Sequence, residues 1–109
     1  MNLSDIQTMV GNTAAKKGWD EREVPFPETI ALVHSELSEA LEEWRKGWDE
    51  DELYFREDGK PEGLLMEMAD AVIRIMHWAE VHDLDLEDAI LRKDAFNLTR
   101  PFRHGGKVG

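Results

Sequence analysis

The chain has 109 residues, of which 41% are hydrophobic, with 24 acidic side chains, 13 basic side chains and no cysteine. This size and apolar content fit one globular domain, while the lack of cysteine excludes a disulfide scaffold, a thiolate zinc site and a cysteine nucleophile. The formal net charge of -11 disfavours nucleic acid and anionic membranes as partners. We expect a cytoplasmic protein, because the sequence contains no transmembrane stretch and no signal peptide.

The charge is unevenly distributed along the chain. Residues 1–91 hold 8 basic and 23 acidic side chains, whereas residues 92–109 hold five basic residues against a single acidic one, Asp94. We therefore expect one helical domain over residues 1–98, followed by a basic C-terminal tail over residues 99–109. Composition alone leaves two interpretations of this tail open: a loosely solvated end, and a segment that contributes to the substrate site.

The first part of the domain is predicted to form two helices. Ser4 and Gln7 have the spacing of a capping box for a first helix, which is expected to end just before Gly18. Pro27 suits the first turn of a second helix over residues 28–46, because proline is tolerated where the backbone N–H has no helical partner.

The connection over residues 47–61 is unusually long for a helical bundle and has room for a short helical turn. A third helix is predicted over residues 61–81, and Asp85 suits the N-cap of a fourth helix that reaches about Leu98. No segment has a convincing strand pattern. The expected fold class is all-α, an antiparallel four-helix bundle completed by oligomerisation.

The second predicted helix combines an apolar face with an acidic stripe. Its apolar residues recur at three- and four-residue steps and are predicted to face the core: Ile30, Val33, Leu37, Ala40, Leu41 and Trp44. Glu36, Glu39 and Glu43 share a neighbouring stripe, and carboxylates one turn apart repel one another unless a cation lies between them. A solvated acidic edge and a cation site are the two interpretations of this stripe.

The third predicted helix is apolar from Leu64 to Ala79 apart from four residues in one narrow stripe, Glu67, Asp70, Arg74 and His77. Such a helix is expected to be mostly buried, with Trp78 in the core, and buried carboxylates need a partner or a metal ion. Arg74 follows Asp70 by one turn and is one such partner, which favours a structural salt bridge. A single arginine cannot neutralise the carboxylates of both helices.

Two facing helices with the pairs Glu36/Glu39 and Glu67/Asp70, each at i and i+3, would direct four carboxylates into one small volume. Oxygen-only ligand sets suit Mg²⁺, with Mn²⁺ as a substitute. A di-iron bundle is disfavoured because its Glu-x-x-His motifs do not occur in the sequence, and a Ser-His-Asp hydrolase is disfavoured because no Gly-x-Ser-x-Gly motif occurs.

Glu36-Leu37-Ser38-Glu39 followed by Glu67-Met68-Ala69-Asp70 resembles the E-x-x-E and E-x-x-D signature of the MazG-like nucleoside triphosphate pyrophosphohydrolases, in the all-α NTP pyrophosphatase superfamily. The similarity extends to the Lys17-Gly18-Trp19 pattern and to the closing run from Arg100 to Lys107, so it covers nearly the whole chain. The resemblance implies a MazG-like fold and hydrolysis of (d)NTP to (d)NMP and pyrophosphate by a metal-activated water. One departure is Ser35, where some relatives carry a further glutamate.

The resemblance also implies roles for individual side chains. Glu36, Glu39, Glu67 and Asp70 would bind Mg²⁺ as the catalytic set. The substrate would be held by residues of the fourth helix and the tail: Lys93, Asn97, Arg100, Arg103, His104 and Lys107. Trp19 is a candidate to stack on the base, although its place beside a glycine also suits a core plug. Glu43, as an acceptor of the water's proton, and Arg74 are auxiliary candidates.

The expected partners are a nucleoside triphosphate and further copies of the chain. Four helices of this length leave the apolar third helix short of cover, which a second subunit would provide. The resemblance implies a homodimer or a dimer-based tetramer with sites near the subunit interface. The alternative is a non-catalytic helical protein that binds nucleotides or acts in assembly and has kept the fold.

Overall fold

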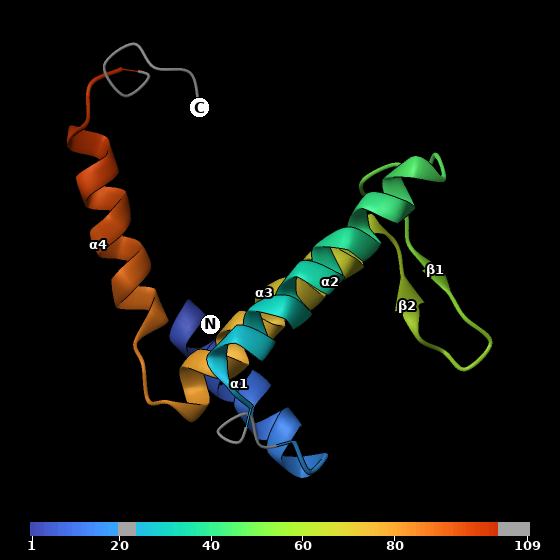
Figure 1. The fold of residues 1–109 in the computed structure, drawn as a ribbon, viewed down its shortest axis with the longest axis horizontal. Helices are drawn as coiled ribbons and strands as arrows, with labels where there is room; N and C mark the ends of the chain where they lie inside the picture. Colours follow the sequence, from blue (N-terminus) through green and yellow to red (C-terminus); the bar gives the residue numbers. More distant parts are fainter. Residues whose placement is uncertain (20–23, 103–109) are drawn as a thin grey trace.

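The computed structural model describes residues 1–19 and 24–102, and in these ranges the chain is mostly helical (Figure 1). Its elements in chain order are α1 (Leu3–Lys16), α2 (Phe26–Arg45), β1 (Tyr54–Phe55), β2 (Pro61–Glu62), α3 (Leu64–Val81) and α4 (Leu86–Thr99). The predicted helical class is therefore confirmed, whereas the small sheet was not predicted. None of the described helices has the length and apolarity needed to cross a membrane.

The N-terminus of α1 is capped by Asn2 rather than by Ser4. The Asn2 side chain accepts a hydrogen bond from the Asp5 backbone N–H (2.8 Å), and the Asp5 carboxylate accepts one from the Asn2 N–H (3.1 Å). The predicted capping box of Ser4 and Gln7 is wrong, because Gln7 is buried and its amide donates to Glu80 Oε1 (3.1 Å). Gln7 thereby ties α1 to the end of α3.

A hairpin of two short antiparallel strands lies between α2 and α3, and a single hydrogen-bonded turn, in which the Glu52 N–H donates to the Asp49 carbonyl (3.1 Å), precedes it. Tyr54 of β1 lies opposite Glu62 of β2 in its register. Helix α3 consequently begins at Leu64 instead of Pro61, since Pro61 and Glu62 belong to β2. Trp48 stacks on Tyr54 with ring centroids 4.8 Å apart, which holds the segment before the hairpin against the first strand.

Gly63 joins β2 to α3 in a backbone conformation that only glycine adopts easily, with φ at +136°. A Cβ at this position would also run into the backbone carbonyl oxygen of Glu52. We therefore expect Gly63→Ala to lower the free energy of unfolding by about 2 kcal/mol or more, measured by urea denaturation. Gly59→Ala is the control, because Gly59 has φ at +88° and open space around it. An equal loss in both variants would contradict the expected clash.

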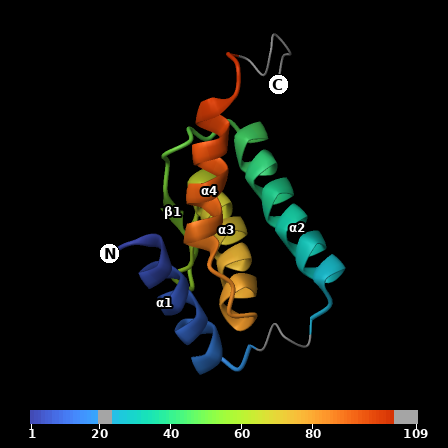
Figure 2. The ribbon, with the colours of Figure 1, turned by 90° about the vertical axis from the view of Figure 1, so that its left-hand side faces the viewer.

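Three helices pack together in the described part of the chain. Helices α2 and α3 run antiparallel as the central pair, and α1 packs against α3 (Figure 2). The buried hydrophobic residues at these contacts are mostly small: Val33, Ala40, Ala71, Met76 and Ala79. Small side chains let the helix backbones approach closely, so the polar groups between α2 and α3 also lie close to one another.

Helix α2 turns its acidic stripe, and not its apolar stripe, toward α3. Its buried residues are Thr29, Val33, Glu36, Ala40 and Glu43. Four apolar residues that were predicted as core lie about a quarter-turn away and are exposed: Ile30, Leu37, Leu41 and Trp44. The prediction was wrong for these four because α3 presents its own polar stripe to α2, so that Arg74 contacts Glu36 across the interface. The apolar stripe of α2 is left outside.

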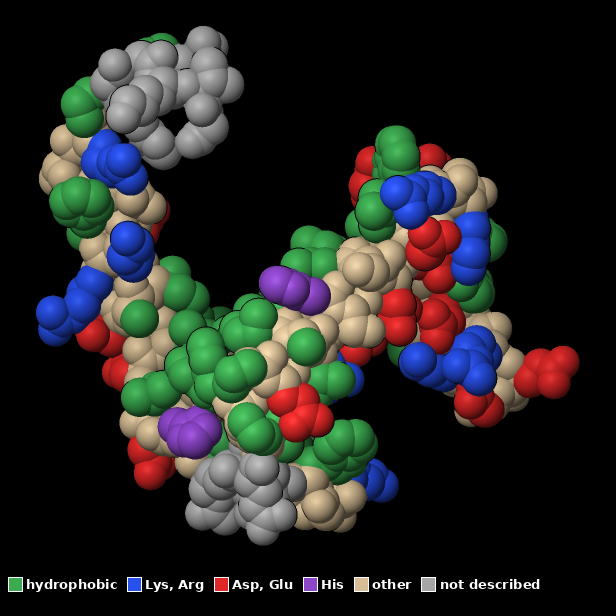
Figure 3. Space-filling view, viewed as in Figure 1, with side chains coloured by type: hydrophobic (Ala, Val, Ile, Leu, Met, Phe, Trp, Pro, Cys, Tyr) green, Lys and Arg blue, Asp and Glu red, His purple; other side chains and the backbone are tan. Residues whose placement is uncertain are grey.

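Helix α3 also leaves part of its apolar surface uncovered. Four apolar residues spaced three or four apart along one side are exposed: Leu65, Met68, Val72 and Ile75. Trp78, predicted as core, is half-buried, with its ring centroid 5.5 Å from that of Phe26. Figure 3 shows hydrophobic side chains gathered over the α2–α3 pair and charged side chains gathered around the hairpin. An apolar surface of this kind is typical of a protein–protein interface.

Helix α4 stands apart from the α2–α3 pair and has no buried residue (Figure 1). Asp85 caps it, as predicted, by accepting a hydrogen bond from the Asp88 N–H (2.9 Å). Its base is held to α1 by Glu87, whose carboxylate accepts from the Leu3 N–H (3.0 Å) and from the Ser4 hydroxyl (3.2 Å). The single chain does not close the predicted four-helix bundle, because the contacts that hold α4 lie at its base.

Candidate metal and nucleotide site

Three of the four carboxylates predicted as metal ligands converge between α2 and α3. Oxygens of Glu36, Glu67 and Asp70 lie within 4.8 Å of one another. Glu39, one turn after Glu36, is exposed and lines a neighbouring cavity together with Glu67, and its proximity contributes to the raised pKa of Glu67. The i, i+3 spacing places each pair on one side of its helix, and the antiparallel packing brings the two sides together.

The negative charge of this cluster is only partly compensated by the described residues. Arg74 Nε donates to Glu36 Oε1 (3.0 Å) across the α2–α3 interface, so the structural salt bridge expected of Arg74 forms with Glu36 of the facing helix. Burial and the neighbouring Glu36 charge raise the pKa of Asp70. In the described part of the chain, Glu67 Oε2 is buried without a hydrogen-bond partner. An all-oxygen donor set with an orphaned buried oxygen fits a hard divalent cation.

Burial and hydrogen bonds with Glu39 and Glu62 raise the pKa of Glu67 from 4.5 to about 8. The stabilisation that this proton provides is fully present below about pH 4.5 and is lost as the pH rises through about 8. We therefore expect metal-free wild type to lose stability relative to Glu67→Gln over this range, by more than about 1 kcal/mol. Urea denaturation in EDTA at both ends of the range measures the difference. A difference that does not change with pH would contradict the raised pKa.

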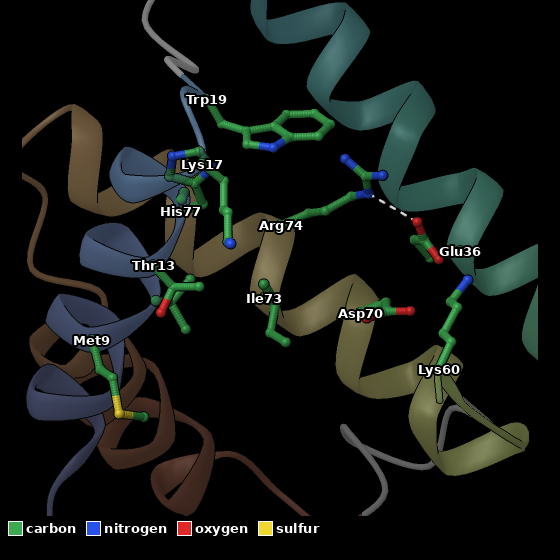
Figure 4. A pocket seen from close by; sticks show the side chains of 12 residues that line it. Met9, Thr13, Lys17, Trp19, Glu36, Lys60, Asp70, Ile73, Arg74 and His77 are labelled. Carbon is green, nitrogen blue, oxygen red and sulfur yellow. Dashed lines mark hydrogen bonds and ion pairs between the residues drawn. The ribbon is translucent and has the colours of Figure 1, made fainter. Parts of the chain in front are cut away.

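The cluster borders a cavity of about 540 Å³ between α1, α2 and α3 (Figure 4). Glu36 and Asp70 line one side of it, with Lys60 of the hairpin beside them. Trp19 lines the cavity and is 61% exposed, which suits a platform for a ligand and argues against a core plug. The other polar side chains around the cavity include Lys17, Arg74 and His77. Carboxylates, cations and an aromatic ring around one hollow suit a phosphorylated ligand with a flat base.

Lys60 and Glu62 were not predicted as site residues. Lys60 Nζ lies 3.1 Å from Glu62 Oε1, and an oxygen of Glu62 lies within 4.8 Å of oxygens of Glu43 and Glu67. Helical periodicity cannot find these residues, because they lie in a hairpin; the turn signal over residues 58–61 was the available clue. Glu43, predicted as an auxiliary residue beside the other carboxylates, belongs to this second group.

Three of the C-terminal residues predicted to hold the substrate lie in the described part of the chain, and these three do not reach the carboxylates within one chain. Lys93, Asn97 and Arg100 lie exposed on α4 and at its end, which stands apart from α2 and α3 (Figure 1). The Lys93 Nζ and Arg100 Cζ atoms lie 5.9 and 5.8 Å from the ring centroid of Phe96, so two cations flank one aromatic ring. The other predicted residues lie outside the described part of the chain: Arg103, His104 and Lys107.

The chain matches no protein-family model, no curated protein sequence and no solved structure. The side chains of the carboxylate cluster and of the cavity beside it are therefore the basis for assigning a function. Their chemistry combines hard oxygen donors, exposed cations and an exposed indole ring.

Proposed function

We propose that the protein is a Mg²⁺-dependent nucleoside triphosphate pyrophosphohydrolase, which cleaves (d)NTP to (d)NMP and pyrophosphate. The observation that carries this proposal is the convergence of oxygens of Glu36, Glu67 and Asp70 within 4.8 Å, beside a cavity that also holds an aromatic ring and several cations. The resemblance of the E-x-x-E and E-x-x-D motifs to the MazG-like signature supports the same reaction.

Four carboxylates would hold the ion: Glu36, Glu39, Glu67 and Asp70. Their oxygens suit Mg²⁺, which keeps part of its water shell and accepts phosphate oxygens of a substrate, and Mn²⁺ takes the same ligands. When bound, such an ion neutralises phosphate charge and lowers the pKa of a coordinated water. Glu67 and Asp70, whose pKa values are raised without metal, would then be carboxylates and not protonated acids.

The nucleotide would be positioned by the side chains around the cavity. Trp19 offers an exposed flat ring on which a base can stack. Lys17 and Lys60 offer ammonium groups to the phosphates, and Lys60 lies on the same side as Asp70 (Figure 4). Phosphoryl transfer depends mainly on positioning and charge neutralisation, so a cavity with this lining needs no covalent nucleophile.

We infer that the active form is a homodimer or a dimer-based tetramer, in which α4 of one subunit covers the carboxylates of the other. The exposed apolar stripes of α2 and α3 support this arrangement, because large apolar patches are rare on monomers. Helix α4 has complementary features, with exposed apolar residues and cations at Ile90, Leu91, Lys93, Phe96, Leu98 and Arg100. Docked on the acidic body of a second copy, α4 would bring Lys93, Asn97 and Arg100 to the phosphates.

Pyrophosphate release from a panel of ribo- and deoxynucleoside triphosphates tests the proposal. With Mg²⁺ we expect at least one nucleotide to give a monophosphate and pyrophosphate in equal amounts, and we expect no release in EDTA. Orthophosphate as the product would indicate cleavage at a different linkage and would overturn the proposed reaction. A nucleotide that binds without being cleaved would favour the alternative, a non-catalytic nucleotide-binding or assembly protein.

A further inference from the structure

Glu43, Glu62 and Glu67 form a second carboxylate cluster, at the end of the α2–α3 pair that carries the hairpin. One oxygen from each lies within 4.8 Å of the others, and the three residues come from α2, β2 and α3. Glu43 is 5%, Glu62 is 9% and Glu67 is 3% exposed. Carboxylates are almost never buried together without a compensating charge, because each loses its hydration.

The protein groups that contact this cluster leave two of its oxygens unsatisfied. The Tyr54 hydroxyl donates to Glu43 Oε1 (2.9 Å), and Lys60 Nζ lies 3.1 Å from Glu62 Oε1. Within the described ranges, the buried Oε2 atoms of Glu43 and Glu67 have no hydrogen-bond partner. Two orphaned oxygens, both on side chains of this cluster that are more than nine-tenths buried, point to a ligand of the cluster.

The nearby cations do not fill this role. Arg56 Nη1 lies 3.9 Å from Glu62 Oε1, the oxygen that Lys60 also contacts, and the Arg56 side chain is 55% exposed. Lys46 Nζ lies 3.9 Å from Glu43 Oε1, and the side chains of Lys46 and Lys60 are 59% and 49% exposed. Solvent therefore screens both ammonium charges, and neither reaches the orphaned oxygens. The first cluster, which consists of Glu36, Glu67 and Asp70, does have a cation in direct contact, because the guanidinium of Arg74 contacts Glu36.

We propose that Glu43, Glu62 and Glu67 form a second cation site, which binds a hard divalent ion such as Mg²⁺ or Ca²⁺ and ties the hairpin to α2 and α3. Its donors are all carboxylate oxygens, the ligands that such ions prefer. A cavity of about 280 Å³ lies beside the cluster and is lined in part by Glu43 and Glu67. The site shares Glu67 with the proposed catalytic cluster but requires no hydrolysis.

Terbium luminescence tests this site, because Tb³⁺ replaces hard divalent ions at oxygen ligands and is excited through nearby aromatic rings. Tyr54, which contacts Glu43 and stacks on Trp48, is a local antenna. Trp19→Phe protein is used throughout, to remove the indole beside the first cluster. We expect saturable sensitised emission that excess Mg²⁺ or Ca²⁺ displaces. Emission no stronger than that of free Tb³⁺ would overturn the proposal.

Substitutions in the same background separate the two clusters. Glu62→Gln is expected to weaken Tb³⁺ binding at least tenfold, whereas Glu36→Gln, which alters only the first cluster, keeps the sensitised emission. Glu42→Gln is the matched control, because Glu42 is adjacent to Glu43 in the sequence but pairs with Arg45 on the exposed side of α2 (2.7 Å).

Melting in EDTA verifies that each variant is folded. Equal affinities for Glu62→Gln and Glu42→Gln would overturn the proposal and would indicate that protons shared among the three carboxyl groups, and not a cation, hold the cluster together. Tb³⁺ binding tests the second cation site and pyrophosphate release tests the proposed reaction. Because the two measurements are independent, each proposal can fail without the other.

Discussion

Asp70→Asn is expected to lower kcat for pyrophosphate release at least about 100-fold while leaving the fold intact. The Asp70 carboxylate lies within 4.8 Å of oxygens of Glu36 and Glu67, where its charge would help to hold Mg²⁺. An amide has the same size but carries no charge and binds a hard cation weakly. The measurement is steady-state pyrophosphate release at saturating Mg²⁺, with a nucleotide that the wild type cleaves.

Asp88→Asn is the matched control for this variant. Asp88 lies exposed on α4, where its carboxylate accepts a hydrogen bond from Arg92 (2.7 Å). The stability of Asp70→Asn in EDTA shows whether the substitution removes only a metal ligand or also damages the fold. Because burial and the Glu36 charge raise the pKa of Asp70, removal of its charge relieves repulsion, and the variant should unfold no earlier than wild type. A rate within threefold of wild type would contradict the role of this carboxylate.

The metal-ligand candidates could be predicted because helix geometry alone relates them to one another. Glu36 and Glu39 lie on the same side of α2 however the helices pack, and the same is true of Glu67 and Asp70 on α3. The apolar composition of α3 then required its few polar residues to meet a partner. The cap at Asp85 was predictable for a similar reason, since its hydrogen bond to the Asp88 N–H is local in sequence.

The rotation of α2 and the hairpin contacts could not be predicted in this way. An apolar stripe such as that of Leu37 and Leu41 indicates which side chains avoid water, but it does not indicate whether the same chain or a second copy covers them. Glu62 lies in a strand of two residues and Lys60 in the turn before it, and the register of the two strands depends on this turn. So short a strand has no periodicity from which its position could be predicted.

A charge on the exposed apolar stripe of α2 is expected to dissociate the homodimer. Leu37 is 41% exposed on the same side of α2 as Leu41 and Trp44. Leu37→Asp would place an unpaired carboxylate in the proposed interface and weaken self-association at least about 30-fold. Ala31→Asp, on an exposed side of α2 away from this stripe, is the control. Analytical ultracentrifugation gives the masses, and a wild type that sediments at the chain mass of 12.6 kDa would contradict the prediction.

Mixing two inactive variants is expected to restore activity, because α4 is proposed to complete the site of the partner subunit. Asp70→Asn removes a carboxylate of the body, and Lys93→Ala removes a cation of α4. In a heterodimer, one of the two sites combines an intact body with an intact α4, so an equal mixture should regain about a quarter of the wild-type pyrophosphate release. Adding Leu37→Asp to both variants should abolish the recovery, because it prevents the heterodimer from forming. If α4 instead served the carboxylates of its own chain, every site in the mixture would keep one defect, and no activity would return.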